Sequence, residues 1–219
     1  MNIVFDLDGT LIDSAPDIHA AGLNALTAEG LPPVTAEQTR SFIGNGSSVF
    51  IARLEVATTG QSLPERHARM LARFLKVYET THDQTRPYPG VPETLEALRV
   101  AGWQLGLCTN KPIAPARAVL AHLGWGKVFA SVIGGDSLAV IKPDPAPLRA
   151  VIEALGAGPV VYVGDSEVDA ATAQAASVPF ALFKLGYRKT PVSAIPHARA
   201  FDNFLDLPDI AARLAREMC

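Results

Sequence analysis

The chain begins with an apolar run that ends at two aspartates and a glycine, Asn2-Ile3-Val4-Phe5-Asp6-Leu7-Asp8-Gly9-Thr10-Leu11. Residues 2–5 are typical of a short buried strand, and the polar residues after them are typical of a turn. More apolar runs follow much later, at residues 104–108, 131–133, 160–163 and 180–183. They alternate with helical patterns over residues 92–101, 113–123, 146–155, 167–176 and 208–217. This alternation predicts an α/β fold, a three-layer Rossmann-like core with a parallel sheet between helices.

Residues 14–85 depart from this alternation and have almost wholly helical patterns. Ser14 followed by Pro16 is typical of a helix N-cap with proline in the first turn. Thr35-Ala36-Glu37-Gln38 matches a capping box, and apolar residues between positions 62 and 82 have helical spacing. We therefore predict a core of residues 1–13 and 86–219, with an all-α cap domain of residues 14–85 inserted after the first strand.

The composition excludes several classes of protein. The 219 residues carry 19 Lys and Arg against 22 Asp and Glu, so there is no basic excess for a nucleic-acid backbone. Uncharged apolar runs are shorter than the ~18 residues that a membrane span needs. The two cysteines, Cys108 and Cys219, lie far apart and do not indicate a disulfide framework. We expect a cytoplasmic globular protein, monomeric or homodimeric, without nucleic-acid or membrane partners.

Polar residues gather where the predicted strands end. Ligands of open parallel sheets bind outside the carboxyl ends of the strands, so side chains at these positions are candidates for one site. They are Asp6 and Asp8 after the first strand, Thr109, Asn110 and Lys111 after the second, Lys142 beyond the third, and Asp165, Ser166 and Asp169 after the fourth.

This set of side chains constrains the chemistry of the site. Four carboxylates close together need compensation, which Lys142 and a divalent cation would supply. Oxygen ligands favour a hard ion, so Mg²⁺ is the predicted cofactor, and the absence of Cys or His near these positions argues against zinc. The remaining charge predicts one carboxyl kept protonated as a general acid. Metal and ammonium together favour an anionic substrate, most simply a phosphate.

These motifs resemble those of the haloacid dehalogenase superfamily. Asp6-Leu7-Asp8-Gly9-Thr10 matches its Asp-x-Asp-Gly-Thr signature, and three later motifs follow in order: Thr109-Asn110, Lys142-Pro143 and Gly164-Asp165-Ser166-x-x-Asp169. Each later motif is weak alone, but the ordered set, each after a predicted strand, covers essentially the whole chain.

The resemblance implies a role for each matching residue. Asp6 resembles the nucleophile that forms an aspartyl-phosphate, and Asp8 the acid/base that protonates the leaving oxygen and later activates water. Asp6, the backbone carbonyl of Asp8, and Asp165 would hold Mg²⁺. Thr109, Asn110 and Lys142 would bind the phosphoryl group, while Asp169 and Ser166 would orient these groups.

Asp8 also discriminates within the superfamily, because dehalogenases lack an acid there. The cap and Phe42-Ile43-Gly44-Asn45-Gly46 resemble phosphoglycolate phosphatases, which implies a phosphatase that converts 2-phosphoglycolate to glycolate. Since backbone amides at a helix start bind anions, Gly44, Asn45 and Gly46 are expected to contact the substrate carboxylate. A plain helix-connecting turn is an equally good interpretation of this loop.

Several alternatives stay open at this point. A phosphomutase like β-phosphoglucomutase, a pyrophosphatase or a sugar-phosphate phosphatase would use the same motifs. A phospho-acceptor switch domain is the non-enzymatic alternative, although its acceptor normally lies mid-domain. The sequence leaves undecided what the basic residues Lys111, Lys184, Arg188 and Lys189 do, and whether Asp136 reaches the site.

Overall fold

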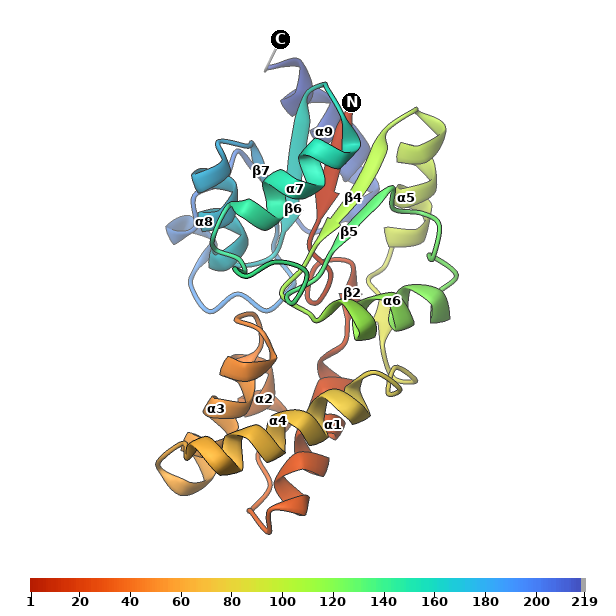
Figure 1. The fold of residues 1–219 in the computed structure, drawn as a ribbon. Helices are drawn as coiled ribbons and strands as arrows, with labels where there is room; N and C mark the ends of the chain where they lie inside the picture. Colours follow the sequence, from red (N-terminus) through yellow and green to blue (C-terminus); the bar gives the residue numbers. More distant parts are fainter. Residues whose placement is uncertain (218–219) are drawn as a thin grey trace.

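A computed structural model describes residues 1–217 and shows a parallel six-stranded sheet in the order β5-β4-β1-β6-β7-β8 (Figure 1). The strands are β1 (Asn2–Phe5), β4 (Gln104–Cys108), β5 (Ser131–Ile133), β6 (Val160–Gly164), β7 (Phe180–Phe183) and β8 (Arg199–Phe201). Five of them match the apolar runs of the sequence. The predicted fold class is confirmed.

The first strand lies in the middle of this sheet, where the strand order reverses direction. From β1 the chain adds β4 and β5 on one side, then returns to add β6, β7 and β8 on the other. Phe5 pairs in register with Leu107 of β4 and with Val163 of β6. The residue after β1, Asp6, is therefore level with the carboxyl ends of both neighbouring strands, at the switch point where such sheets bind ligands.

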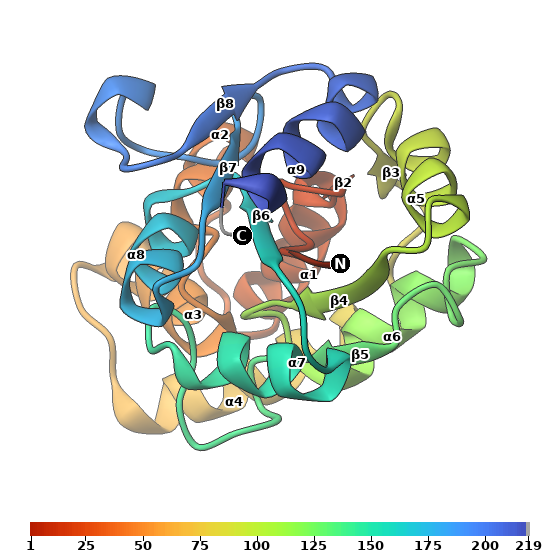
Figure 2. The same ribbon diagram turned by 90° about the horizontal axis from the view of Figure 1, so that it is seen from above.

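Helices cover both faces of the sheet and make a three-layer core (Figure 2). Side chains of α5 (Val91–Val100), α6 (Ile113–His122) and α9 (Leu207–Arg216) share one buried apolar cluster with Ile3 and Phe5. Those of α7 (Ala146–Leu155) and α8 (Glu167–Ala176) share another with Val4, which points the other way. This division follows from the alternation of side chains along β1.

Four helices lie together beyond the carboxyl edge of the sheet (Figure 1). They are α1 (Ala15–Ala28), α2 (Ala36–Phe42), α3 (Ser47–Thr59) and α4 (Pro64–Tyr78), and they enclose an apolar cluster of their own. The capping box at Thr35 is confirmed, since Thr35 accepts from the Gln38 amide and the Gln38 side chain accepts from the Thr35 amide. Ser14 is the N-cap residue of α1 but makes no side-chain capping hydrogen bond; its hydroxyl is directed at Asp8, to which it donates at 2.6 Å.

The chain passes twice between the sheet and these four helices. The two passages run side by side as a short antiparallel pair, β2 (Ile12–Asp13) and β3 (Arg86–Pro87). Neither strand was expected from the sequence, because two residues are too few for a periodic pattern. The Tyr187 hydroxyl accepts from the amides of Ser14 and Ala15 and so ties the start of α1 to the core.

Two further observations bear on the sequence predictions. None of the helices within residues 1–217 is long and apolar enough to cross a membrane. Cys108 is buried in β4 with a free thiol, whereas Cys219 lies outside the described residues.

Candidate active site

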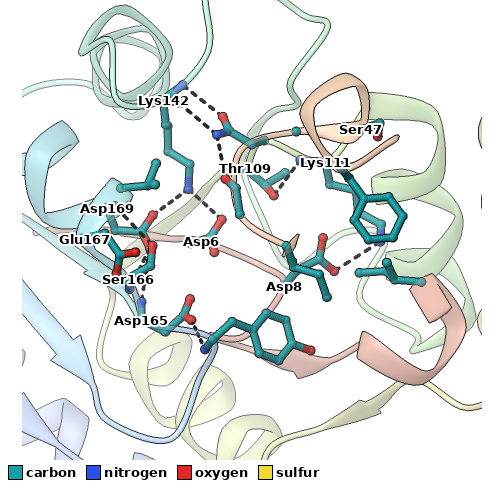
Figure 3. Close-up of a pocket in the computed structure, with 18 of the residues that line it drawn as sticks. Asp6, Asp8, Ser47, Thr109, Lys111, Lys142, Asp165, Ser166, Glu167 and Asp169 are labelled. Carbon is teal, nitrogen blue, oxygen red and sulfur yellow. Dashed lines mark hydrogen bonds and ion pairs between the residues drawn. The ribbon is translucent and has the colours of Figure 1, made fainter. Parts of the chain in front are cut away.

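A pocket opens between the carboxyl edge of the sheet and helices α1, α3 and α4. Its sheet side carries the residues that follow β1, β4 and β6, and its opposite wall carries apolar side chains of the helices, among them Ile18, Phe50 and Phe74. Figure 3 shows the polar side chains in two groups, one around Asp6 and one around Asp8.

The first group surrounds the Lys142 ammonium. Its Nζ donates to Asp6 Oδ1 at 2.7 Å, to Asp169 Oδ1 at 2.7 Å and to the Tyr162 hydroxyl at 2.9 Å. An ammonium has three N–H groups, so all of them have partners. The carboxylates of Asp169 and Asp6 raise the pKa of Lys142 against the opposing effect of burial, so this lysine is a fixed positive charge.

Asp165 occupies the other side of Asp6 and is held by the core. Its Oδ1 accepts from the Thr10 hydroxyl at 2.9 Å, and its Oδ2 accepts from the Tyr187 amide. Gly9 and Gly186 pack so closely that a Cβ on either would lie within 2.6 Å of Asp165 Oδ2. Glycine is required at both positions because any larger residue would displace this carboxylate.

Asp169 lies in the first turn of helix α8, and both of its carboxylate oxygens accept hydrogen bonds from the protein. Its Oδ1 accepts from Lys142 and from the Tyr162 hydroxyl, and its Oδ2 accepts from the Ser166 hydroxyl at 2.6 Å. Ser166 is the N-cap of α8, and together the two residues form a capping box. Asp169 and Ser166 therefore line the pocket beside Asp6, Asp165 and Lys142, with both Asp169 oxygens engaged by protein donors.

Asp6, Asp165 and Asp169 form a buried cluster that suits a metal ion. One carboxylate oxygen from each lies within 4.8 Å of the others. Burial raises the pKa of Asp6 to about 7, and burial with the charges of Asp169 and Asp6 raises that of Asp165 well above its usual value. Because oxygen donors of this kind prefer hard cations, the donor set and its surplus negative charge both fit a divalent ion.

The second group surrounds Asp8, whose two oxygens differ in their partners (Figure 3). Oδ1 accepts from the Ser14 hydroxyl at 2.6 Å and from Lys111 Nζ at 3.2 Å. Oδ2 has only the Tyr78 hydroxyl of α4 within reach among the described residues, at 3.4 Å. The carboxylate is thus fixed through Oδ1, while Oδ2 is the oxygen available to a substrate.

Asn110 uses its whole amide group inside the protein. Its Nδ2 donates to the carbonyls of Gly44 and Lys142, both at 3.0 Å, and its Oδ1 accepts from the Lys142 amide at 3.0 Å. Both N–H groups are therefore occupied, and the side chain joins the Lys142 backbone to the loop after α2. Thr109 also lines the pocket, where its Oγ1 accepts from the Lys111 amide and keeps its own hydrogen to donate.

The loop between α2 and α3 forms part of the pocket wall on the side of the four helices. Gly44 and Gly46 both line it, and Gly46 with φ 82° is the N-cap of α3. The Asn45 side chain accepts from Arg53 at 2.8 Å. The loop therefore lines the pocket at Gly44 and Gly46, where it has only backbone atoms. The Asn45 side chain is bound to Arg53 and does not line the pocket.

The residues whose roles the sequence left undecided lie in different places, some in the pocket and some outside it. Asp136 caps the start of α6 by accepting from the Ile113 amide at 2.7 Å, and Lys184 pairs with Asp202 at 2.6 Å. Lys189 lines the mouth of the pocket and donates to the Ile43 carbonyl at 3.1 Å, and Arg188 beside it is half-buried. Lys111 is buried with Asp8.

Lys111 changes the charge balance inferred from the sequence. That inference counted four carboxylates against Lys142 and a divalent cation, which left one negative charge for a proton. The ammonium of Lys111, with a side chain only 3% exposed, adds a positive charge next to Asp8 that this count left out. Burial lowers the pKa of Lys111, and the Asp8 carboxylate opposes that change.

Comparisons with known proteins show which proteins this chain is similar to. A family model of haloacid dehalogenase-like hydrolases matches residues 1–177. A phosphoglycolate phosphatase of Cereibacter sphaeroides is 49% identical over 97% of this chain and 98% of its own length. Phosphoglycolate phosphatase 1 of Pseudomonas aeruginosa is 38% identical over 97% of this chain and 80% of its own.

A solved structure is also similar over nearly the whole chain. The crystal structure of a predicted phosphoglycolate phosphatase from Haemophilus somnus superposes with a TM-score of 0.88 at 32% identity, covering 95% of this chain and 96% of that one. The resemblance expected from the sequence motifs is confirmed.

Proposed function

The chain belongs to the haloacid dehalogenase-like hydrolases, and we propose that it is a Mg²⁺-dependent phosphatase that hydrolyses 2-phosphoglycolate through an aspartyl-phosphate at Asp6. The observation that carries the proposal is the pairing of Asp6, held by Lys142, with Asp8, which is held through Oδ1 and lines the same pocket. Two carboxylates in different surroundings, side by side at a sheet edge, suit a nucleophile and an acid/base.

In the first step an Asp6 oxygen attacks phosphorus, and the bond between phosphorus and the glycolate oxygen breaks. Asp8 Oδ2 gives its proton to that leaving oxygen. Lys142 keeps Asp6 oriented and offsets negative charge, and the Thr109 hydroxyl donates to a phosphoryl oxygen. Asn110 supports this step indirectly, by fixing the backbone of Lys142 through both sides of its amide.

In the second step Asp8 accepts a proton from water, and the water oxygen attacks the phosphorus of the aspartyl-phosphate. The bond to Asp6 breaks, and inorganic phosphate leaves. Division into two displacements replaces one difficult step with two easier ones. The cap, which we propose spans residues 14–85, closes over the pocket and keeps bulk water from the intermediate.

A Mg²⁺ ion would be held by Asp6, Asp165 and the backbone carbonyl of Asp8. When bound, it would neutralise charge on the phosphoryl oxygens. Asp169 and Ser166 orient these groups, because both Asp169 oxygens already accept from protein donors, Lys142 and Ser166. The backbone of the loop at Gly44 and Gly46 contacts the substrate from the cap side. The cytoplasmic location and the monomeric or homodimeric state stay predictions.

The substrate preference is supported by the relatives, and the alternatives differ in products. A sugar phosphomutase would return the phosphoryl group to a second hydroxyl, and a pyrophosphatase would release two phosphates. The apolar wall of Ile18, Phe50 and Phe74 offers no hydrogen-bond partners for the hydroxyls of a sugar, which disfavours a sugar phosphate. A switch domain has no need of an acid/base such as Asp8.

The test is a panel of phosphate esters scored by kcat/KM, with 2-phosphoglycolate, pyrophosphate, glucose 1-phosphate and ribose 5-phosphate. We expect 2-phosphoglycolate to give the highest value and glycolate with phosphate as products. The variant Asp6→Asn, which keeps shape but removes the nucleophile, serves as the inactive control. A higher kcat/KM for another ester, or isomerised sugar phosphate as product, would refute the proposed substrate.

A further inference from the structure

We propose that Lys111 determines specificity by binding the carboxylate of the leaving group. This inference rests on the proposed function and names a residue for substrate choice within the same pocket. Three cationic side chains line the pocket among the residues described: Lys142, Lys111 and Lys189. Each has a different environment, and these environments assign them to different parts of the substrate.

Lys142 is committed to the phosphoryl end. All three of its N–H groups donate to Asp6, Asp169 and Tyr162, so none is left for a second anionic group. Lys189 is exposed at the pocket mouth and donates to the Ile43 carbonyl. A lysine at the surface contributes little to the recognition of an anion, because water screens it.

Lys111 has both the position and the free donor that a carboxylate needs. Its Nζ donates to Asp8 Oδ1 and to the Tyr78 hydroxyl, and these are its acceptors among the described residues. One N–H group of the ammonium is left for a ligand. Since the side chain is 3% exposed, a contact with an anion here is shielded from water and correspondingly strong.

The chemistry of the leaving group places its carboxylate near this ammonium. Asp8 Oδ2 protonates the ester oxygen, and in glycolate the carbon that carries this oxygen also carries the carboxylate. Lys111 Nζ lies 3.2 Å from the other oxygen of the same Asp8 carboxylate. A group bound at Oδ2 therefore brings its carboxylate within reach of Lys111, on the side of Asp8 away from Lys142 (Figure 3).

The loop after α2 is less suited to this role than its glycines suggest. The carbonyls of Ile43 and Gly44 both accept from core donors, Lys189 and Asn110. Two carbonyl oxygens directed at the core present partial negative charge to that side, which disfavours an anion there. The Gly46 N-cap and α3 contribute neutral amides, whereas Lys111 contributes a full positive charge.

The test compares 2-phosphoglycolate with 2-hydroxyethyl phosphate, in which a neutral hydroxymethyl group replaces the carboxylate. Wild type is expected to prefer 2-phosphoglycolate in kcat/KM. Lys111→Met should lose on the order of 10- to 100-fold on 2-phosphoglycolate, the effect of removing a charge-assisted hydrogen bond, and much less on the neutral ester. Lys111→Arg keeps the cation and should keep most of the preference.

The control is Lys184→Met, the same substitution at a surface lysine paired with Asp202, which should leave both values unchanged. If Lys111→Met does not fold, judged by its thermal unfolding, Lys111→Gln gives the same comparison. An equal loss on both esters would show that Lys111 acts only through Asp8, and a retained preference would place carboxylate recognition elsewhere; either overturns the proposal. Wild type without activity on 2-phosphoglycolate would instead refute the proposed function.

Discussion

Replacement of Asn110 by alanine tests how the pocket is held together. The substitution removes three hydrogen bonds that join the Lys142 backbone to Gly44 across the pocket. It leaves the amide and carbonyl of Lys142 without these partners in a buried position, at a cost of about 1–3 kcal/mol for each such group. Because water can reach the half-buried Gly44 carbonyl, we expect a total loss of about 3 kcal/mol in the free energy of unfolding.

Thermal unfolding measures this loss directly. For a chain of this size, about 3 kcal/mol corresponds to a decrease in Tm of roughly 6–12 °C. Asn110→Asp is the matched variant: it keeps the acceptor for the Lys142 amide but turns a carboxylate oxygen toward two carbonyls, so it should lose about as much. Asn45→Ala, which removes one contact with Arg53 in the adjoining loop, is the control and should change Tm far less.

The kinetic expectation follows from the same contacts. A misplaced Lys142 fails to orient Asp6, so kcat should fall at least tenfold while KM changes less. An unchanged Tm together with a raised KM and a normal kcat would refute this reasoning. That result would mean that the Asn110 amide binds substrate and that its contacts with Lys142 and Gly44 contribute nothing.

The remaining predictions concern the metal, the turn after the first strand and the cap. Chelation by EDTA should abolish phosphatase activity and added Mg²⁺ should restore it, and activity indifferent to chelator would contradict the proposed metal site. Gly9→Ala should abolish activity and lower Tm, because φ is 90° at this position and the new Cβ would lie 2.6 Å from Asp165 Oδ2; near-normal turnover would show that the cradle around this carboxylate is dispensable. Glu55 is buried in the cap and accepts from Ser62 and Arg66, which hold its pKa below the ordinary value against the effect of burial. Glu55→Gln should therefore lower the free energy of unfolding by about 3 kcal/mol at neutral pH. This difference should shrink as the pH falls below 4.5, because the stabilisation by the ionised carboxylate is complete above the pKa of the unfolded chain and is lost as the pH falls toward the lower pKa of the folded state. A Tm difference that is the same at pH 7 and at low pH would count against this prediction.

The sheet could be predicted because its four inner strands, β1, β4, β6 and β7, are buried almost throughout. Each of the five expected strands is a short apolar run followed by polar residues, and such runs are typical of parallel sheets. The sixth strand, β8, was not expected: it contains Arg199, spans three residues and lies at the sheet edge, so burial shapes its sequence less. Pairing with β7 determines it, and a local pattern cannot show such a partner.

Ser14 shows how a local rule can be overridden. A serine before Ala15 and Pro16 has every feature of an N-cap, and helix α1 does begin at Ala15. The side chain is instead directed at Asp8, to whose carboxylate its hydroxyl donates a charge-assisted hydrogen bond. Ser14 is the N-cap residue of this helix, as predicted, but its side chain does not make the capping hydrogen bond.

The candidate site could be located from the sequence, but its internal contacts could not. The rule that polar residues follow strands leads to Asp6, Thr109 and Asp165. Gly186 and Tyr187, which hold Asp165, also follow a predicted strand, at residues 180–183; they contribute a close backbone approach and an amide, which the residue types alone do not indicate.

Tyr162 was not predicted, and Lys111 was predicted near the site but without a role, for a different reason. Tyr162 lies inside an apolar strand, where an aromatic side chain is ordinarily core, and only its hydroxyl reaches Lys142 and Asp169. Lys111 follows a strand end like many surface lysines. Its burial depends on Tyr78 of α4, a residue far away in the sequence that the fold brings beside Asp8.

The central claim is that Asp6 carries the phosphoryl group, and the most direct test is to trap it there. Wild-type protein turning over 2-phosphoglycolate is quenched and reduced with borohydride, which converts an acyl phosphate to an alcohol, and the peptide that contains residues 1–11 is analysed by mass spectrometry. Our account predicts homoserine at position 6, dependent on substrate and absent from Asp6→Asn. An unmodified Asp6 under conditions of active turnover, or reduction at another carboxylate such as Asp8, would contradict it.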